Sequence, residues 1–316
     1  MRWLRLLLGV LIMTLAACAS DPVRVSSQTW RQVDAEIACA SRAAEAQARQ
    51  HALEAMGRWL VLVQRQTDEE FIPWFSGYWT QQWLGLRVSW YRLGSDDSVQ
   101  RLAAYLQEEY QEQVLEPVAE DISPERIQRG ATKIYVRQLD MRLQGIAARH
   151  GVPQRQFERR LQALPAIAGT PGASLHQLLR ADPLERLPAY AALLERVRPV
   201  PGGDWSSDPG ISLVAQRTSE RLIGEMAAGG AASAIGAAVG GAAGTALSLG
   251  VGLFTAIVRS NDRPRSEAQL RLSLQATLEQ ESQALLRSRE RGVLAGVWQL
   301  SGQIERSLGR PFDYRP

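Results

Sequence analysis

The sequence has few of the residue types on which enzyme active sites are commonly built. Its 316 residues include 2 cysteines and 3 histidines, and Lys133 is the only lysine. The histidines, His51, His150 and His176, lie far apart and show no metal-ligand spacing such as HExxH. The GxSxG and GxxxxGK[ST] motifs of hydrolases and nucleotide-binding proteins are also missing. We therefore expect a protein that is not an enzyme and that holds no metal or cofactor.

A strong excess of charge of either sign is missing as well. The 36 basic and 33 acidic residues leave a net charge of +3. The arginines are spread among acidic residues instead of forming a basic block. Nucleic acid is therefore not expected as a partner.

The start of the chain has a charged and then an apolar pattern. Arg2 and Arg5 precede an apolar run over residues 6–17, which is the layout of a secretory signal peptide and is too short for a permanent membrane span. The run ends in the sequence LAAC at residues 15–18, which resembles the lipobox of bacterial lipoproteins. The resemblance implies that residues 1–17 are removed and that Cys18 becomes the first residue, with covalent lipid attached.

The resemblance also implies a location and a role for the cysteines. Ala19, in place of an aspartate after Cys18, resembles the pattern of sorting to the outer membrane. Acyl chains contribute about 0.8 kcal/mol per buried methylene, so the mature chain would be held firmly at a bilayer and face the periplasm. Lipidation of Cys18 would leave Cys39 without a partner for an internal disulfide. Cys39 lies in an apolar helical pattern and is expected to be buried.

Helical signals dominate the chain from Thr29 onward. Apolar residues at steps of three and four predict a helix of about forty residues from Thr29 to about Gln66, and a second one of similar length from Ser266 to Leu308. Further helices are expected at residues 99–118, 124–150, 153–164, 174–181 and 183–197, although the β-branched residues 132–136 could instead form a strand. The predicted fold class is all-α: an elongated helical bundle with long N- and C-terminal helices and a Gly/Ala-rich apolar helix or hairpin.

Composition divides the chain into successive parts. They are a signal peptide (1–17), a tether (18–28), a helical periplasmic domain (29–198), a Pro/Gly linker (199–212), a charged helix with a Gly/Ala-rich apolar segment (213–258), a basic linker (259–265), a long C-terminal helix that packs on the bundle (266–309) and a tail (310–316).

Residues 71–90 are the most aromatic part of the chain. On a helix that starts near Pro73, the aromatic residues would share one broad face. This aromatic face comprises Phe71, Trp74, Tyr78, Trp79, Trp83 and Trp90. It could form the core of the bundle, rest against a bilayer, or hold an apolar ligand or a partner protein.

A second unusual segment, residues 226–258, is rich in glycine and alanine and carries no charge. Every fourth residue from Gly224 to Ala256 is small, which would leave a flat strip where another helix can approach closely. The segment resembles the glycine-zipper segments of certain outer-membrane lipoproteins and pore-forming proteins, through Gly236, Gly240 and Gly244, and Gly252 lies on the same strip. The resemblance implies close helix packing and self-association. A flexible loop and a soluble hairpin core are the alternatives.

Together these patterns predict a lipid-anchored cell-envelope protein that is not an enzyme. Its small-residue helix would mediate membrane association or self-assembly, with the membrane, further copies of the chain or envelope-complex proteins as partners. One alternative is a periplasmic binding or secretion-accessory module that uses the aromatic face. A less favoured alternative is a hydrolase built on carboxylates that meet in the fold, such as Glu69, Glu70 or Asp140.

Overall fold

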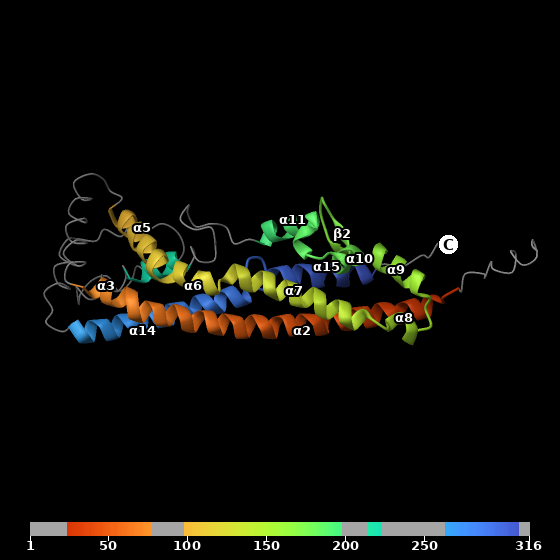
Figure 1. Ribbon diagram of the computed structural model, residues 1–316, viewed down its shortest axis with the longest axis horizontal. Coiled ribbons are helices and arrows are strands. Elements are labelled where there is room, and N and C mark those ends of the chain that lie inside the picture. The colour runs from red at the N-terminus through yellow and green to blue at the C-terminus, as the bar shows by residue number, and fades with distance from the viewer. Residues whose placement is uncertain (1–23, 78–97, 198–213, 223–262, 310–316) are drawn as a thin grey trace, which may run out of the picture. The chain divides into compact units, whose positions relative to one another are not determined.

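The computed structural model describes residues 24–77, 98–197, 214–222 and 263–309 (Figure 1). These residues are mostly helical, and the strands among them form one 2-stranded sheet. The predicted all-α fold class is confirmed. None of the helices in the described ranges has the length and apolar character needed to cross a membrane.

The chain divides into two compact units. The first unit comprises Met1–Ala44, Val136–Tyr190 and Leu300–Pro316, and the second comprises Glu45–Tyr135 and Ala191–Gln299. Helices α2 (Ser27–Gln66), α7 (Pro124–Leu143), α11 (Pro188–Val197) and α15 (Ala295–Leu308) contribute residues to both units.

Helix α2 begins two residues before the predicted start at Thr29. The Ser26 hydroxyl accepts a hydrogen bond from the Thr29 backbone N–H at 3.1 Å, so Ser26 caps the helix. Along the helix, Ala44, Ala48 and Ala52 are fully buried. Such small side chains allow neighbouring segments to pack close to the helix backbone.

Cys39 is exposed on α2, so the prediction that it is buried was wrong. The buried neighbours on this stretch of the helix are Ile37, Ala40 and Ser41. Cys39 follows Ile37 by two positions and therefore points to a different side of a helix with 3.6 residues per turn.

Two helices continue through a wide π-turn. Helix α2 leads into η1 (Thr67–Phe71) and α3 (Ile72–Ser76), and α5 (Ser98–Tyr110) leads into η2 (Gln111–Leu115) and α6 (Glu116–Asp121). The second residue after each π-turn is a proline, Pro73 or Pro117. Proline has no N–H and its ring crowds the preceding turn of a regular helix, and a wider turn accommodates it without ending the helix.

Helix α7 starts as predicted but ends earlier. The Ser123 hydroxyl accepts a hydrogen bond from the Arg126 backbone N–H at 3.2 Å, and Pro124 is the first helical residue. Residues 132–136 are helical and not a strand. The predicted continuous helix to His150 was wrong, because Gly145 adopts φ of 82° and separates α7 from α8 (Ile146–Arg149).

A small hairpin, which the sequence did not predict, follows α9 (Gln154–Ala163). Strand β1 (Pro165–Ile167) pairs antiparallel with β2 (Ala173–Ser174), and Ser174 caps α10 (Leu175–Arg180) in a capping box with Gln177. The predicted helix over residues 183–197 is divided into η3 (Leu184–Arg186) and α11, because Leu187 before Pro188 is extended.

The C-terminal region contains two helices where one was predicted. Helix α14 (Arg263–Arg287) and α15 are separated by residues 288–294. The Gly292 N–H donates to the Ser288 carbonyl at 3.0 Å, and the Val293 N–H donates to the Leu285 carbonyl at 3.0 Å. These hydrogen bonds turn the chain in a way that a continuous helix would not allow.

Candidate functional site

Each unit contains a group of interacting polar side chains. In the first unit, Glu36 contacts Arg149 and His150, and we call these three residues the Glu36 cluster. In the second unit, Tyr110 is hydrogen-bonded to Thr67, and we call these two residues the Tyr110 cluster.

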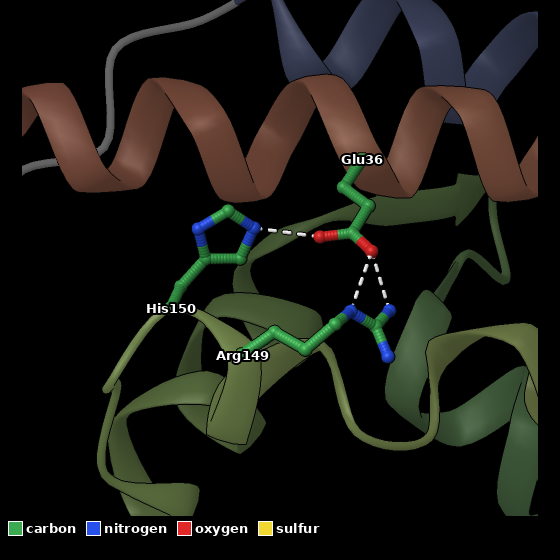
Figure 2. Close-up of polar contacts among 3 residues, drawn as sticks. All are labelled: Glu36, Arg149 and His150. Atoms are coloured by element: carbon green, nitrogen blue, oxygen red, sulfur yellow. Dashed lines mark hydrogen bonds and ion pairs between the residues drawn. The ribbon is translucent and has the colours of Figure 1, made fainter.

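The Glu36 cluster joins α2 to the end of α8 (Figure 2). Gly145 and Gly151, both with positive φ, begin and end the short turn of chain that carries Arg149 and His150. The Arg149 Nε donates to Glu36 Oε1 at 2.9 Å, and its Nη2 donates to the same oxygen. His150 Nε2 lies 2.6 Å from Glu36 Oε2. Each carboxylate oxygen therefore has its own partner.

These contacts set the charge state of Glu36. The hydrogen bonds from Arg149 are the largest influence and lower the pKa of the carboxyl, with help from His150, although burial acts in the opposite direction. The contact with His150 is an ion pair whenever the imidazole is protonated. The cluster is thus an electrostatic link between α2 and the end of α8.

The Glu36 carboxylate orients the His150 ring. The carboxylate holds one ring nitrogen, and Figure 2 shows the other nitrogen on the side of the ring turned away from Glu36. Within the described ranges, no hydroxyl or thiol is hydrogen-bonded to this ring.

Two further ion pairs hold elements of the first unit against α2. Arg160 donates two hydrogen bonds to Asp34, at 2.9 and 2.6 Å, and the Arg160 side chain is only 3% exposed. Paired donation of this kind satisfies a buried guanidinium, which would otherwise be costly to bury. On the surface, Arg42 pairs with Glu305 of α15 at 3.3 Å.

The Tyr110 cluster lies where the two π-turns of the second unit meet. The Thr67 hydroxyl donates to the Val63 carbonyl at 2.7 Å and shares a hydrogen bond of 2.8 Å with the Tyr110 hydroxyl. The ring of Phe71 meets that of Tyr110 edge to face, with centroids 4.9 Å apart. Burial raises the pKa of Tyr110, so the phenol is neutral at physiological pH.

Helix α14 is tied to this region by polar contacts. Arg271 Nε donates to Asp68 of η1 at 2.9 Å, and Arg221 Nε donates to the Ser273 hydroxyl at 2.6 Å. Glu281 on the same helix is largely buried, and burial raises its pKa despite the nearby Arg217. These contacts hold the helices around the Tyr110 cluster. The side chains of Tyr110 and Thr67 are buried.

Most residues singled out from the sequence lie outside the described residues. These are Cys18, Tyr78, Trp79, Trp83, Trp90, Gly236, Gly240, Gly244 and Gly252. Two members of the aromatic face are described. Phe71 is fully buried, and Trp74 is half-buried, with its ring centroid 5.4 Å from that of Phe71 and 6.4 Å from that of Tyr105.

The candidate carboxylates and histidines are spread over the described structure. Glu69 and Glu70 are exposed on η1, and half-buried Asp140 accepts a hydrogen bond from Gln144 at 3.5 Å. His51 and His176 are each half-buried. Across the described ranges, no three residues among His, Cys, Asp and Glu are grouped so as to hold a metal ion.

The sequence contained no local signal for the Glu36 cluster. Glu36 and His150 are 114 positions apart, and Asp34 and Arg160 are 126 positions apart. In the sequence, His150 is one of three widely separated histidines without metal-ligand spacing. Its contact with Glu36 depends on the packing of α8 against α2, which residue spacing does not reveal.

Comparison with known proteins returned no similar chain. No protein-family model, no curated protein and no solved structure matches this sequence or its fold.

Proposed function

We propose that this chain is a lipid-anchored cell-envelope protein that works by association and not by catalysis. Its helical body would be held at the periplasmic face of the outer membrane by acyl chains on Cys18. The observation that carries the proposal is the start of the sequence, where two arginines, an apolar run and the LAAC motif end at that cysteine.

The surface of the described body supports attachment through the lipid anchor and not through the body itself. Large apolar side chains of the described residues are mostly buried, and the exposed ones are Leu53, Val61, Met141 and Leu272. Isolated exposed apolar residues are normal on a protein surface and do not hold a protein at a bilayer. Attachment would then depend on the covalent lipid, assisted by residues 226–258.

The proposed association uses the small-residue strip in residues 226–258. Small side chains at every fourth position let two helix backbones approach closely. Glycine costs about 1 kcal/mol relative to alanine in an isolated helix, so a helix of this composition needs a membrane or a tightly packed partner. Copies of the chain would pack through Gly236, Gly240 and Gly244, with Gly252 on the same strip.

The direct test is the chemical state of the mature N-terminus. We expect mass spectrometry of the full-length protein, expressed in a Gram-negative host, to find an acylated peptide that begins at Cys18. Cys18→Ser should abolish both acylation and recovery in the detergent phase on phase separation. Cys39→Ser is the matched control, because Cys39 is exposed and should be dispensable. A mature chain with an unmodified Cys18, or one that keeps its leader, would refute the proposal.

A further inference from the structure

The loop between α14 and α15 presents three arginines at the surface. Arg287 ends α14, Arg289 and Arg291 follow it, and all three are exposed. We call these three residues the arginine loop. Glu290 is the single acid among them.

Hydrogen bonds hold the backbone that carries the arginine loop. The Arg291 N–H donates to the Ser288 hydroxyl at 3.2 Å. The Gln128 side chain of α7 donates to the Gly292 carbonyl at 3.0 Å, in a buried position. Together with the hydrogen bonds of Gly292 and Val293, these contacts fix the direction in which the loop leaves the body.

The charges of the arginine loop are not neutralised within the described part of the chain. Arg129, Arg160 and Arg271 each have an acidic partner. No hydrogen bond or ion pair joins the side chain of Arg287, Arg289 or Arg291 to another described residue.

Three exposed arginines on α2 are more widely spaced than those of the arginine loop. Arg49, Arg58 and Arg65 of α2 belong to the same unit and also have no such contact, but they extend over roughly 24 Å of helix. The arginine loop gathers the same number of charges within residues 287–291.

Clustered guanidinium groups on an ordered loop fit phosphate groups. Each guanidinium can donate two parallel hydrogen bonds to phosphate oxygens, and it stays positively charged throughout the physiological pH range. Anionic lipid headgroups supply many phosphates in one plane, and they attract clustered basic residues within the Debye length of the surface.

We propose that the arginine loop is a docking surface for the phosphate headgroups of anionic lipid. This inference rests on the proposed function, because the acyl chains on Cys18 keep the body near a bilayer. The lipid anchor supplies attachment, and the arginine loop selects which side of the second unit meets the headgroups.

The experiment measures binding of the mature polypeptide, residues 18–316 with Cys18→Ser, to vesicles. One set of vesicles contains phosphatidylcholine alone, and the other contains about one third phosphatidylglycerol. We expect stronger binding to the second set, and the difference between the two sets should shrink as salt is raised. The triple variant Arg287→Gln, Arg289→Gln, Arg291→Gln should bind at least about tenfold more weakly.

The matched control removes the same charge elsewhere. Arg49→Gln, Arg58→Gln, Arg65→Gln should bind like the parent protein. An equal loss in both triple variants would mean a net-charge effect and would overturn the inference. Glu290→Arg should strengthen binding by several-fold, which tests the loop without any loss of fold.

Other outcomes separate this inference from the proposed function. If Cys18 is acylated in the natural protein but vesicle binding does not depend on phosphatidylglycerol, the inference fails and the proposed function stands. If Cys18 is not acylated, the proposed function fails whatever the vesicles show. Loss of self-association in the loop variant, with vesicle binding unchanged, would assign the loop to an acidic protein surface and overturn the lipid inference.

Discussion

Gly57 and Gly292, both in the second unit, differ in what a larger side chain would meet. A Cβ atom at Gly57 of α2 would have nothing within 4 Å. A Cβ atom at Gly292 would lie 2.3 Å from the Leu285 carbonyl oxygen and 2.4 Å from the Ser288 carbonyl oxygen. Both obstacles are backbone atoms and cannot move aside as the end of a flexible side chain can.

We therefore expect opposite effects from two Gly→Ala substitutions. Gly292→Ala should lower the free energy of unfolding by about 2 kcal/mol, because the turn before α15 must distort. Gly57→Ala should raise it by up to about 1 kcal/mol, because alanine is the better helix former. Urea denaturation followed by circular dichroism measures both. Equal stability of Gly292→Ala and the parent protein would contradict the close approach of the Leu285 and Ser288 carbonyl oxygens to Gly292.

At the scale of elements, the contact of α8 with α2 depends on ionised Glu36. The pKa of this carboxyl is lower in the folded protein than its ordinary value of 4.5, because Arg149 and His150 favour the charged form. A lowered pKa stabilises the folded state at pH values above that ordinary value. The stabilisation is lost as the pH falls through the folded-state pKa and the carboxyl takes up a proton.

Comparison of Glu36→Gln with the parent protein over a pH series tests this link. At pH 7 the variant should be less stable, since it has no carboxylate to pair with Arg149 and His150. The difference should begin to shrink below about pH 4.5, where the unfolded chain takes up the proton, and it should be lost as the pH falls through the lower folded-state pKa of Glu36. Glu45→Gln is the control, because it removes a carboxylate from the same helix at a position outside the Glu36 cluster. A constant difference across the series would assign the effect to packing instead of charge.

At the scale of the whole molecule, the proposed assembly depends on residues beyond the described body. The helices of the described ranges carry their own buried cores, with Ile37 and Leu139 in the first unit and Trp59 and Leu106 in the second. A body that is packed internally can keep its fold while its association with other copies changes.

Three substitutions on the small-residue strip test the proposed assembly. Gly236→Leu, Gly240→Leu and Gly244→Leu together should abolish self-association, because bulky side chains prevent the close approach of helices. Helical content and the urea unfolding transition should be unchanged. Gly229→Leu, Gly241→Leu and Gly250→Leu, which lie off the strip, serve as the control. Light scattering of the detergent-solubilised protein measures the mass, and retained oligomers in the first triple variant would exclude the strip as the contact.

The sequence by itself determined the features that depend on neighbouring residues. The all-α class follows from apolar spacing, and the start of α7 follows from Ser123 and Pro124. The sequence also singled out the aromatic face. Two of its members, Phe71 and Trp74, lie in the described ranges, and their ring centroids are 5.4 Å apart. Helix periodicity and capping depend on residues a few positions apart, so they can be recognised from the sequence without knowledge of the tertiary structure.

The tertiary structure alone decided the contacts between distant segments. It divided the predicted C-terminal helix near Gly292. The turn there is held by the hydrogen bond from the Val293 N–H to the Leu285 carbonyl and by the one from the Gln128 side chain to the Gly292 carbonyl. It also brought His150 to Glu36 and left Cys39 at the surface. Such outcomes depend on which helix faces pack together, and the energy of that packing comes from residues far apart in the chain.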